Sequence, residues 1–146
     1  LSACEIIVKS GIELKAFFIV GFPQETEETF HDTVSVMRKI KCTLLTFSIF
    51  NPYPGTESFE FCKEKGLISD DYDVALYNNQ SQANCFCINI PHERFRKLVS
   101  KIEKMVDRRN SLNRIKRVFY LTTFRRIQEL GIGESFKKGA RIFMGR

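Results

Sequence analysis

Hydrophobic and polar positions along the first fifty residues predict a helix, a strand, a helix and a strand in turn. Residues 1–10 carry apolar side chains at helical spacing, and Gly11 follows as a helix stop. Residues 15–22 are apolar on both faces and rich in β-forming residues. Such a short run predicts a strand that is buried on both sides, as in a parallel sheet.

The second helix and the second strand have the clearest signals in the chain. Thr26 is the predicted N-cap, with acidic residues around it at the positive end of the helix. One face of this helix is apolar: Phe30, Val34, Met37 and Ile40. Residues 43–50 form the second predicted strand, on which Leu45, Phe47 and Ile49 share one side. Two strands joined through a helix predict a βαβ unit with parallel strands.

The rest of the chain is predicted to be turns, short elements and helices. Thr56 caps a short helix that ends at Gly66, and residues 84–90 read as a short strand. Pro91 starts an amphipathic helix with an apolar stripe: Phe95, Leu98, Val99, Ile102, Met105 and Val106. A break is expected near 110–113, followed by a further helical stretch that stops at Gly131.

Charge is distributed unevenly along the chain. The net charge is +6, but residues 1–90 hold 7 basic and 12 acidic residues, whereas residues 91–146 hold 16 and 5. We therefore predict an α/β part, 1–90, and a basic helical part, 91–146. The basic part could contact the phosphates of RNA or DNA, lie on anionic lipid, or present the solvated outer face of helices packed on a larger protein. Its apolar periodicity favours the third interpretation.

Cysteine usage and hydropathy indicate the cellular setting. The five cysteines are irregularly spaced and no secretory signal precedes them, which predicts a reducing, cytoplasmic location. The longest apolar run, residues 16–22, is far shorter than the about 20 residues of a membrane-spanning helix, so no transmembrane segment is predicted. Cys85 and Cys87 lack a second ligand pair, and His31 and His92 lack ligand-spaced partners, so no metal ligand is assigned.

A candidate ligand site lies where the two predicted strands end. Ligands of parallel α/β proteins bind beyond the carboxyl ends of the strands. Gly21 lies at one such end, where the missing side chain would let a ligand approach the backbone, and Glu25 follows at the helix start. Residues 51–56 lie at the same end of the neighbouring strand. The alternative is a helix-capping turn and a proline-rich turn without a ligand.

Several segments in this order resemble the C-terminal half of the radical S-adenosylmethionine (SAM) core. They are Gly11-Ile12, Phe17-Phe-Ile-Val-Gly-Phe-Pro-Gln-Glu-Thr26, Pro52-Tyr-Pro-Gly-Thr56, Lys63-Glu-Lys-Gly-Leu-Ile68 and Tyr72-Asp73. The likeness is greatest to the branch that often carries a cobalamin-binding domain, and the methylthiotransferase branch is similar at lower resolution. The resemblance implies an α/β fold, the C-terminal half of a partial (β/α)6 TIM-like barrel followed by α-helices. Residues 15–22 would be its fifth strand and residues 43–50 its sixth.

The resemblance also implies which residues touch a cofactor. In the family the fifth-strand motif G-x-I-x-G-x-x-E helps to seat the adenine of SAM. Here Ile19 and Gly21 match its middle, whereas Phe17 replaces its first glycine and Gln24 replaces its glutamate, with Glu25 one place later. The implied cofactor-binding residues are Ile19, Gly21 and Glu25, followed by Phe50, Asn51 and Tyr53.

The family's cluster motif, CxxxCxxC, is absent from this chain. In the family its three cysteines hold a 4Fe-4S cluster that reduces SAM to give a 5′-deoxyadenosyl radical; alternatively, SAM serves as a methyl donor. The resemblance therefore implies a fragment, inactive alone, that contributes part of the SAM adenosine pocket and a wall of the substrate cavity. Its partner would be the missing N-terminal half, and cobalamin is a candidate further cofactor. The alternative function is a small basic α/β module that binds nucleic acid through its C-terminal helices.

Overall fold

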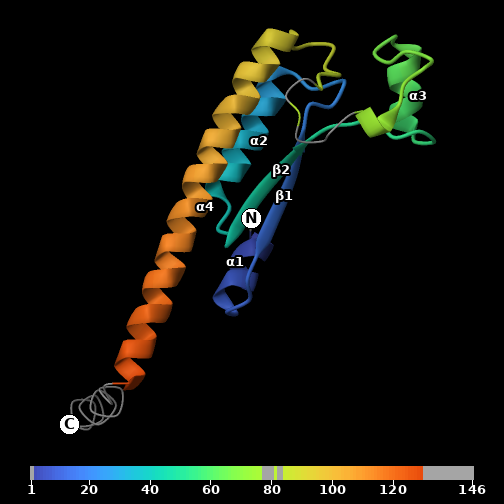
Figure 1. The fold of residues 1–146 in the computed structure, drawn as a ribbon. Coiled ribbons are helices and arrows are strands. Elements are labelled where there is room, and N and C mark those ends of the chain that lie inside the picture. Colours follow the sequence, from blue (N-terminus) through green and yellow to red (C-terminus); the bar gives the residue numbers. More distant parts are fainter. Residues whose placement is uncertain (1, 77–80, 82–83, 130–146) are drawn as a thin grey trace. The chain divides into compact units, whose positions relative to one another are not determined.

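The computed structural model describes residues 2–76, 81 and 84–129, of which Leu76 and residues 123–129 are described by their backbone alone (Figure 1). The chain divides into two compact units, Leu1–Arg109 and Asn110–Arg146. The elements in chain order are α1 (Ser2–Lys9), β1 (Lys15–Val20), α2 (Glu27–Lys39), β2 (Leu44–Ile49), α3 (Glu57–Glu64), a 3-10 turn (Val74–Leu76) and α4 (His92–Glu129).

The two strands pair in parallel, as predicted, with α2 between them in the chain. The register runs from Lys15 opposite Leu44 to Val20 opposite Ile49. A further backbone hydrogen bond beyond the pair joins the Phe50 N–H to the Val20 carbonyl at 2.7 Å. The predicted βαβ unit is therefore confirmed, and the loops that follow β1 and β2 emerge at the same end of the pair.

Helix α2 begins where the sequence predicts, at an N-cap formed by Thr26. The Thr26 hydroxyl accepts the Thr29 N–H at 3.2 Å, and the Thr29 hydroxyl accepts the Thr26 N–H at 3.0 Å. This reciprocal pair satisfies two N–H groups that a helix start otherwise leaves unpaired. Phe30, Met37 and Ile40 of the predicted apolar face are buried.

The core of the first unit lies between the strands, α2 and the first part of α4. Both helices cover the same face of the strand pair (Figure 1). Phe30 and Phe95 meet edge to face with ring centroids 6.2 Å apart. At the surface, Arg94 Nη2 lies 2.6 Å from Glu27 Oε2. The predicted stripe of α4 is confirmed: Phe95, Leu98, Val99, Ile102 and Val106 are buried and Met105 is partly buried.

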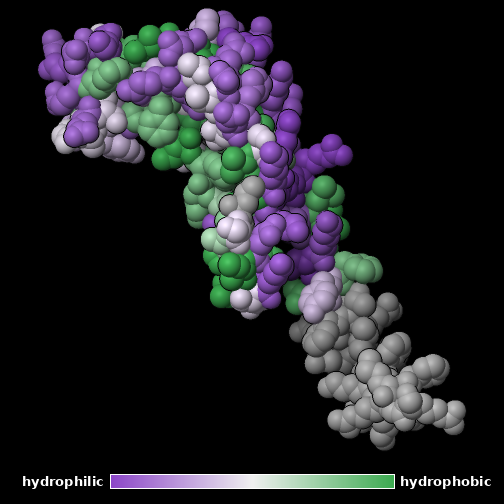
Figure 2. Space-filling model, turned by 180° about the vertical axis from the view of Figure 1, so that it is seen from behind, coloured by the Kyte–Doolittle hydropathy of each residue, from purple (hydrophilic) through white to green (hydrophobic). Residues whose placement is uncertain are grey.

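The prediction that residues 15–22 are buried on both sides is wrong for the described residues. On β1, Ala16 and Val20 are buried, whereas Phe17 is 74% exposed and Ile19 is 52% exposed. The reason is that α2 and α4 pack on the same face of the pair. Figure 2 shows the hydrophobic side chains that gather at the surface over the strands.

The predicted strand at 84–90 and the predicted helix break at 110–113 are also wrong. Residues 84–90 are irregular and end in a bend, held by the Ile88 N–H, which donates to the Pro23 carbonyl at 2.9 Å. Asn84, Phe86 and Ile90 of this segment are buried although it forms no strand. Helix α4 continues through 110–113, because this segment contains neither Gly nor Pro. The predicted stop at Gly131 lies outside the described residues, and the partial barrel and the division near residue 90 stay predictions.

Candidate functional site

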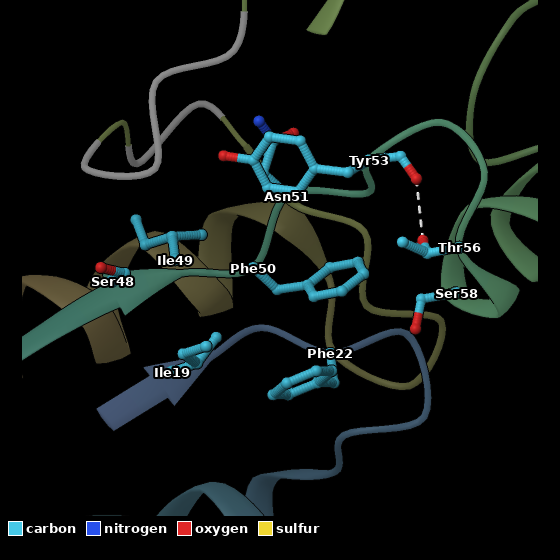
Figure 3. A pocket seen from close by; sticks show the side chains of 9 residues that line it. All are labelled: Ile19, Phe22, Ser48, Ile49, Phe50, Asn51, Tyr53, Thr56 and Ser58. Atoms are coloured by element: carbon cyan, nitrogen blue, oxygen red, sulfur yellow. Dashed lines mark hydrogen bonds between the residues drawn. The ribbon is translucent and has the colours of Figure 1, made fainter. Parts of the chain in front are cut away.

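A cavity of about 310 Å³ lies where β1 and β2 end, in the first unit (Figure 3). Its residues come from the ends of both strands, the loops that follow them and the first turn of α3: Ile19, Phe22, Ser48, Ile49, Phe50, Asn51, Tyr53, Thr56 and Ser58. This position is where parallel α/β folds bind ligands. The cavity is therefore our candidate site.

Aromatic and aliphatic side chains form most of the cavity wall. The rings of Phe22 and Phe50 lie against each other with centroids 4.8 Å apart and planes inclined by 37°. Behind them Phe86 meets Phe50 edge to face at 6.1 Å. Ile19 projects from the exposed face of β1 beside Phe22 (Figure 3). Such a wall suits a flat, largely apolar ring system.

A few polar groups are fixed at the rim of the cavity. The Tyr72 hydroxyl donates to Asn51 Oδ1 at 2.6 Å and lies 3.0 Å from the Pro52 carbonyl, so the buried Asn51 side chain has one orientation. The Thr56 hydroxyl donates to the Tyr53 carbonyl at 2.8 Å and accepts the Phe59 N–H at the start of α3. The turn that presents Tyr53, which is 54% exposed, is thus held at both ends.

The carboxylate of Glu25 does not line this cavity. It is buried and accepts a hydrogen bond from the Gly21 N–H, while the Glu25 N–H donates to the Phe22 carbonyl at 2.9 Å. Burial desolvates the carboxylate and raises its pKa, and hydrogen bonds from the backbone of Gly21 and Phe22 oppose this shift only in part. Glu25 therefore ties together the loop that carries Phe22.

The free energy of unfolding should depend on pH with opposite sign at Glu25, which is buried, and at Glu27, which pairs with Arg94. Because folding raises the pKa of Glu25, its contribution to stability is present below the unfolded pKa and is lost as pH rises through the folded pKa. We therefore compare the free energies of unfolding of Glu25→Gln and wild type, measured by denaturant unfolding. The difference in favour of the variant should be larger at pH 7 than at pH 4. The matched control is Glu27→Gln, since Arg94 lowers the pKa of Glu27 and its contribution is lost as pH falls. Parallel pH profiles of the two variants would contradict the assignment.

Position 21 requires glycine because of its backbone conformation and its close packing against α4, which the sequence did not reveal. Its φ is +91°, and a Cβ added there would lie 2.8 Å from the Phe95 ring of α4. We expected the missing side chain to admit a ligand, but at this position the space is filled by Phe95. Gly21 thus lets α4 pack closely on the end of β1.

Four of the six predicted cofactor-binding residues line the cavity together: Ile19, Phe50, Asn51 and Tyr53. Gly21 and Glu25 do not line it and belong to the loop that carries Phe22. Contact of any of the six with a cofactor stays a prediction. The other five lining residues were not predicted to bind a cofactor: Phe22, Ser48, Ile49, Thr56 and Ser58. Phe22 directly follows the motif glycine, and Ser48 lies opposite Ile19 in the register of the two strands.

Cys85 and Cys87 interact with each other. A hydrogen bond from the Cys87 thiol lowers the pKa of Cys85 to about 6, and the same interaction together with burial raises the pKa of Cys87. Among the residues that the structure describes, no three His, Cys, Asp or Glu side chains are grouped so that they could hold a metal ion.

Comparison with known proteins finds relatives of similar sequence, although no family model and no solved structure matches. An uncharacterized methyltransferase of Pyrococcus horikoshii is 32% identical over 68 residues, 47% of this chain and 15% of the relative. The tRNA-2-methylthio-N(6)-dimethylallyladenosine synthases of Aquifex aeolicus and Vibrio cholerae are 40% and 34% identical over 60 and 76 residues. These matches cover 41% and 52% of this chain, and 13% and 16% of the relatives.

These partial similarities support a relationship to the radical SAM family, as the sequence analysis predicted at the level of the family. They do not single out the cobalamin-associated branch, so cobalamin stays a prediction without support. The chain spans less than a sixth of the length of these three relatives. Within the described residues, no helix combines the length and the apolar character needed to cross a membrane.

Proposed function

We propose that this chain contributes part of a SAM adenosine pocket, and one wall of the substrate cavity, to an enzyme related to radical SAM proteins. The observation that carries the proposal is the cavity at the carboxyl ends of β1 and β2, in which four predicted cofactor contacts lie together. The partial similarity to a methyltransferase and to tRNA methylthio-modifying synthases supports the same assignment.

The chemistry of the cavity fits the adenosine part of SAM. The rings of Phe22, Phe50 and Tyr53 offer apolar surface to a purine, and the Asn51 amide is a polar group in the same wall. The hydrogen bond from Tyr72 to Asn51 Oδ1 holds this side chain at the rim of the cavity. The volume of about 310 Å³ is at the lower end of small-molecule pockets, so we expect other strands to complete the walls.

The iron–sulfur cluster does not fit this chain, because CxxxCxxC is absent from its sequence. We infer that the cluster ligands belong to another part of the parent enzyme, and that the two strands described here are the distal strands of a partial (β/α)6 barrel. The exposed face of β1, with Phe17 and Ile19, would then face the interior of that barrel. The names of the relatives favour a parent reaction that adds a methyl or methylthio group, with tRNA as a candidate substrate.

Binding of SAM, adenosine and methionine to the 146-residue chain, followed by NMR, tests the proposal. SAM and adenosine should shift the methyl resonances of Ile19 and Ile49, whereas methionine alone should not, because the cavity offers it no anionic or sulfur partner. Tyr53→Ala should weaken adenosine binding by roughly tenfold, the loss of one aromatic contact. Phe17→Ala is the matched control, because Phe17 is exposed on β1 but does not line the cavity. Equal shifts with adenosine and methionine, or equal effects of both variants, would overturn the assignment.

A further inference from the structure

Two cysteines of the first unit lie two positions apart and pack differently from the residue between them. Cys85 and Cys87 are partly exposed and pack against the main core, whereas Phe86 is buried in a second cluster with Phe50 and Cys62. The two thiols are also partners in a hydrogen bond. The fold therefore holds them together at a place that solvent can reach.

The spacing of the pair permits a disulfide bond. The Cα atoms of residues i and i+2 lie at most about 7 Å apart, whatever the backbone conformation. Disulfides join Cα atoms that are about 4.4–6.8 Å apart. The chain is anchored directly after the pair, where the Ile88 N–H donates to the Pro23 carbonyl at 2.9 Å. A bond between Cys85 and Cys87 therefore requires only a local change of the backbone between them.

The two thiols differ in acidity. The hydrogen bond from Cys87 is the main cause that lowers the pKa of Cys85 to about 6, and the charge of His92 acts in the same direction. The same hydrogen bond, burial and the charge of Glu25 raise the pKa of Cys87. At pH 7 Cys85 is therefore mostly a thiolate, the form that attacks disulfides, while Cys87 keeps its proton.

We propose that Cys85 and Cys87 form a thiol–disulfide exchange site whose substrate is a small soluble disulfide. The Cys85 thiolate attacks one sulfur of the substrate, whose S–S bond breaks, and one thiolate leaves. Cys85 is then neutral, which removes the main cause of the raised pKa of Cys87. Cys87 loses its proton and attacks Cys85 Sγ, so that the second thiolate leaves. The protein is oxidised to a disulfide and the substrate is reduced to two thiols. The proposal does not depend on the SAM pocket.

The other three cysteines supply the comparison within the same chain. Cys62 is fully buried, and burial raises the pKa of both Cys62 and Cys42. Cys4 and Cys42 are partly exposed and close enough for their charges to interact. They are therefore the matched control pair.

Oxidation of the reduced full chain by glutathione disulfide at pH 7 tests the proposal. Remaining thiols are blocked with N-ethylmaleimide before digestion. Trypsin cuts after Lys65 and Arg94, so peptide 66–94 contains Cys85 and Cys87 and no other cysteine. In mass spectrometry this peptide should be two hydrogens lighter and carry no blocking group, and excess reduced glutathione should restore both thiols.

Single variants separate the two roles. Cys87→Ser should stop at a mixed disulfide between Cys85 and glutathione, because no second thiol remains. Cys85→Ser should slow the reaction of peptide 66–94 roughly tenfold, because burial and Glu25 still raise the pKa of Cys87. The control Cys4→Ser/Cys42→Ser should leave the rate and the product unchanged. Circular dichroism should show the same fold in all variants.

Three results would overturn the proposal. Peptide 66–94 of the wild type would keep two free thiols, or it would carry glutathione on both cysteines. Alternatively, Cys85→Ser and Cys87→Ser would react at the same rate, so that neither thiol would be the preferred nucleophile. In urea the two single variants should react alike, and a difference that persisted there would show that the fold does not set it.

Discussion

Gly21→Ala is expected to lower the free energy of unfolding of the first unit by about 2–5 kcal/mol. A side chain at φ +91° costs about 1–2 kcal/mol, and the 2.8 Å approach of the new Cβ to the Phe95 ring adds an overpacking cost of about 1–3 kcal/mol. Denaturant unfolding followed by circular dichroism measures the change. The effect should be on stability even in the absence of any ligand.

Two further variants separate the two causes. Gly55 has a φ of +85° with nothing within 4 Å of an added Cβ, so Gly55→Ala should cost only the backbone component, about 1–2 kcal/mol. Combining Gly21→Ala with Phe95→Leu should destabilise by less than the sum of the two single changes, because the smaller side chain relieves the contact. If the two changes add fully, Phe95 is not the neighbour that requires glycine.

Arg109→Ala is expected to destabilise the same unit by about 3 kcal/mol. The Arg109 guanidinium donates to the carbonyls of Met37, at 2.5 Å, and Ile40, where α2 ends. Hydrogen bonds to a charged donor contribute about 1.5–3 kcal/mol, and a cation at a helix C-terminus also interacts favourably with the helix dipole. Thermal or denaturant unfolding monitors the loss.

The neighbouring residue supplies the control for this prediction. Arg108 has the same charge but is exposed, so Arg108→Ala should change the free energy of unfolding by less than about 0.5 kcal/mol. Arg109→Lys should recover only part of the loss, because one ammonium group cannot match the forked geometry of guanidinium toward two carbonyls. Similar effects of Arg108→Ala and Arg109→Ala would mean that the contact with α2 contributes nothing.

The sequence was most informative where independent local signals agreed. For α2, the cap at Thr26, the acidic first turn and the spacing of Phe30 and Met37 all indicated the same helix, and its bounds followed within a residue or two. The alternation of Leu45, Phe47 and Ile49 fixed the buried side of β2 in the same way. Parallel pairing followed from the order of elements alone.

Other predictions failed because hydrophobicity does not identify the neighbour that buries a side chain. The apolar run of β1 predicted two buried faces, yet α2 and α4 cover only one. Residues 84–90 are rich in apolar side chains like a strand, but they pack on the Pro23–Glu25 loop without joining the sheet. A short apolar run is thus not enough to predict a strand.

The position of the candidate site was predictable from the sequence, but only some of its lining residues were. The rule for strand ends located it, and Ile19, Phe50, Asn51 and Tyr53 do lie together. The structural reason for Gly21 was not readable, because its neighbour Phe95 comes from a helix far along the chain. Glu25 was placed correctly at the helix start, but its hydrogen bond back to Gly21 depends on a loop shape that no local pattern predicts.

Helix α4 contributes to the core of the first unit, and this has a consequence for how the chain folds during synthesis. The second strand ends at Ile49, but the stripe that covers it runs to Val106, so the ribosome must add roughly 60 residues before the core can close. At 5–20 residues per second this takes roughly 3–12 s, during which the area that α4 later covers is open to water and to chaperones. Slowing translation between these points should therefore prolong chaperone association of the nascent chain.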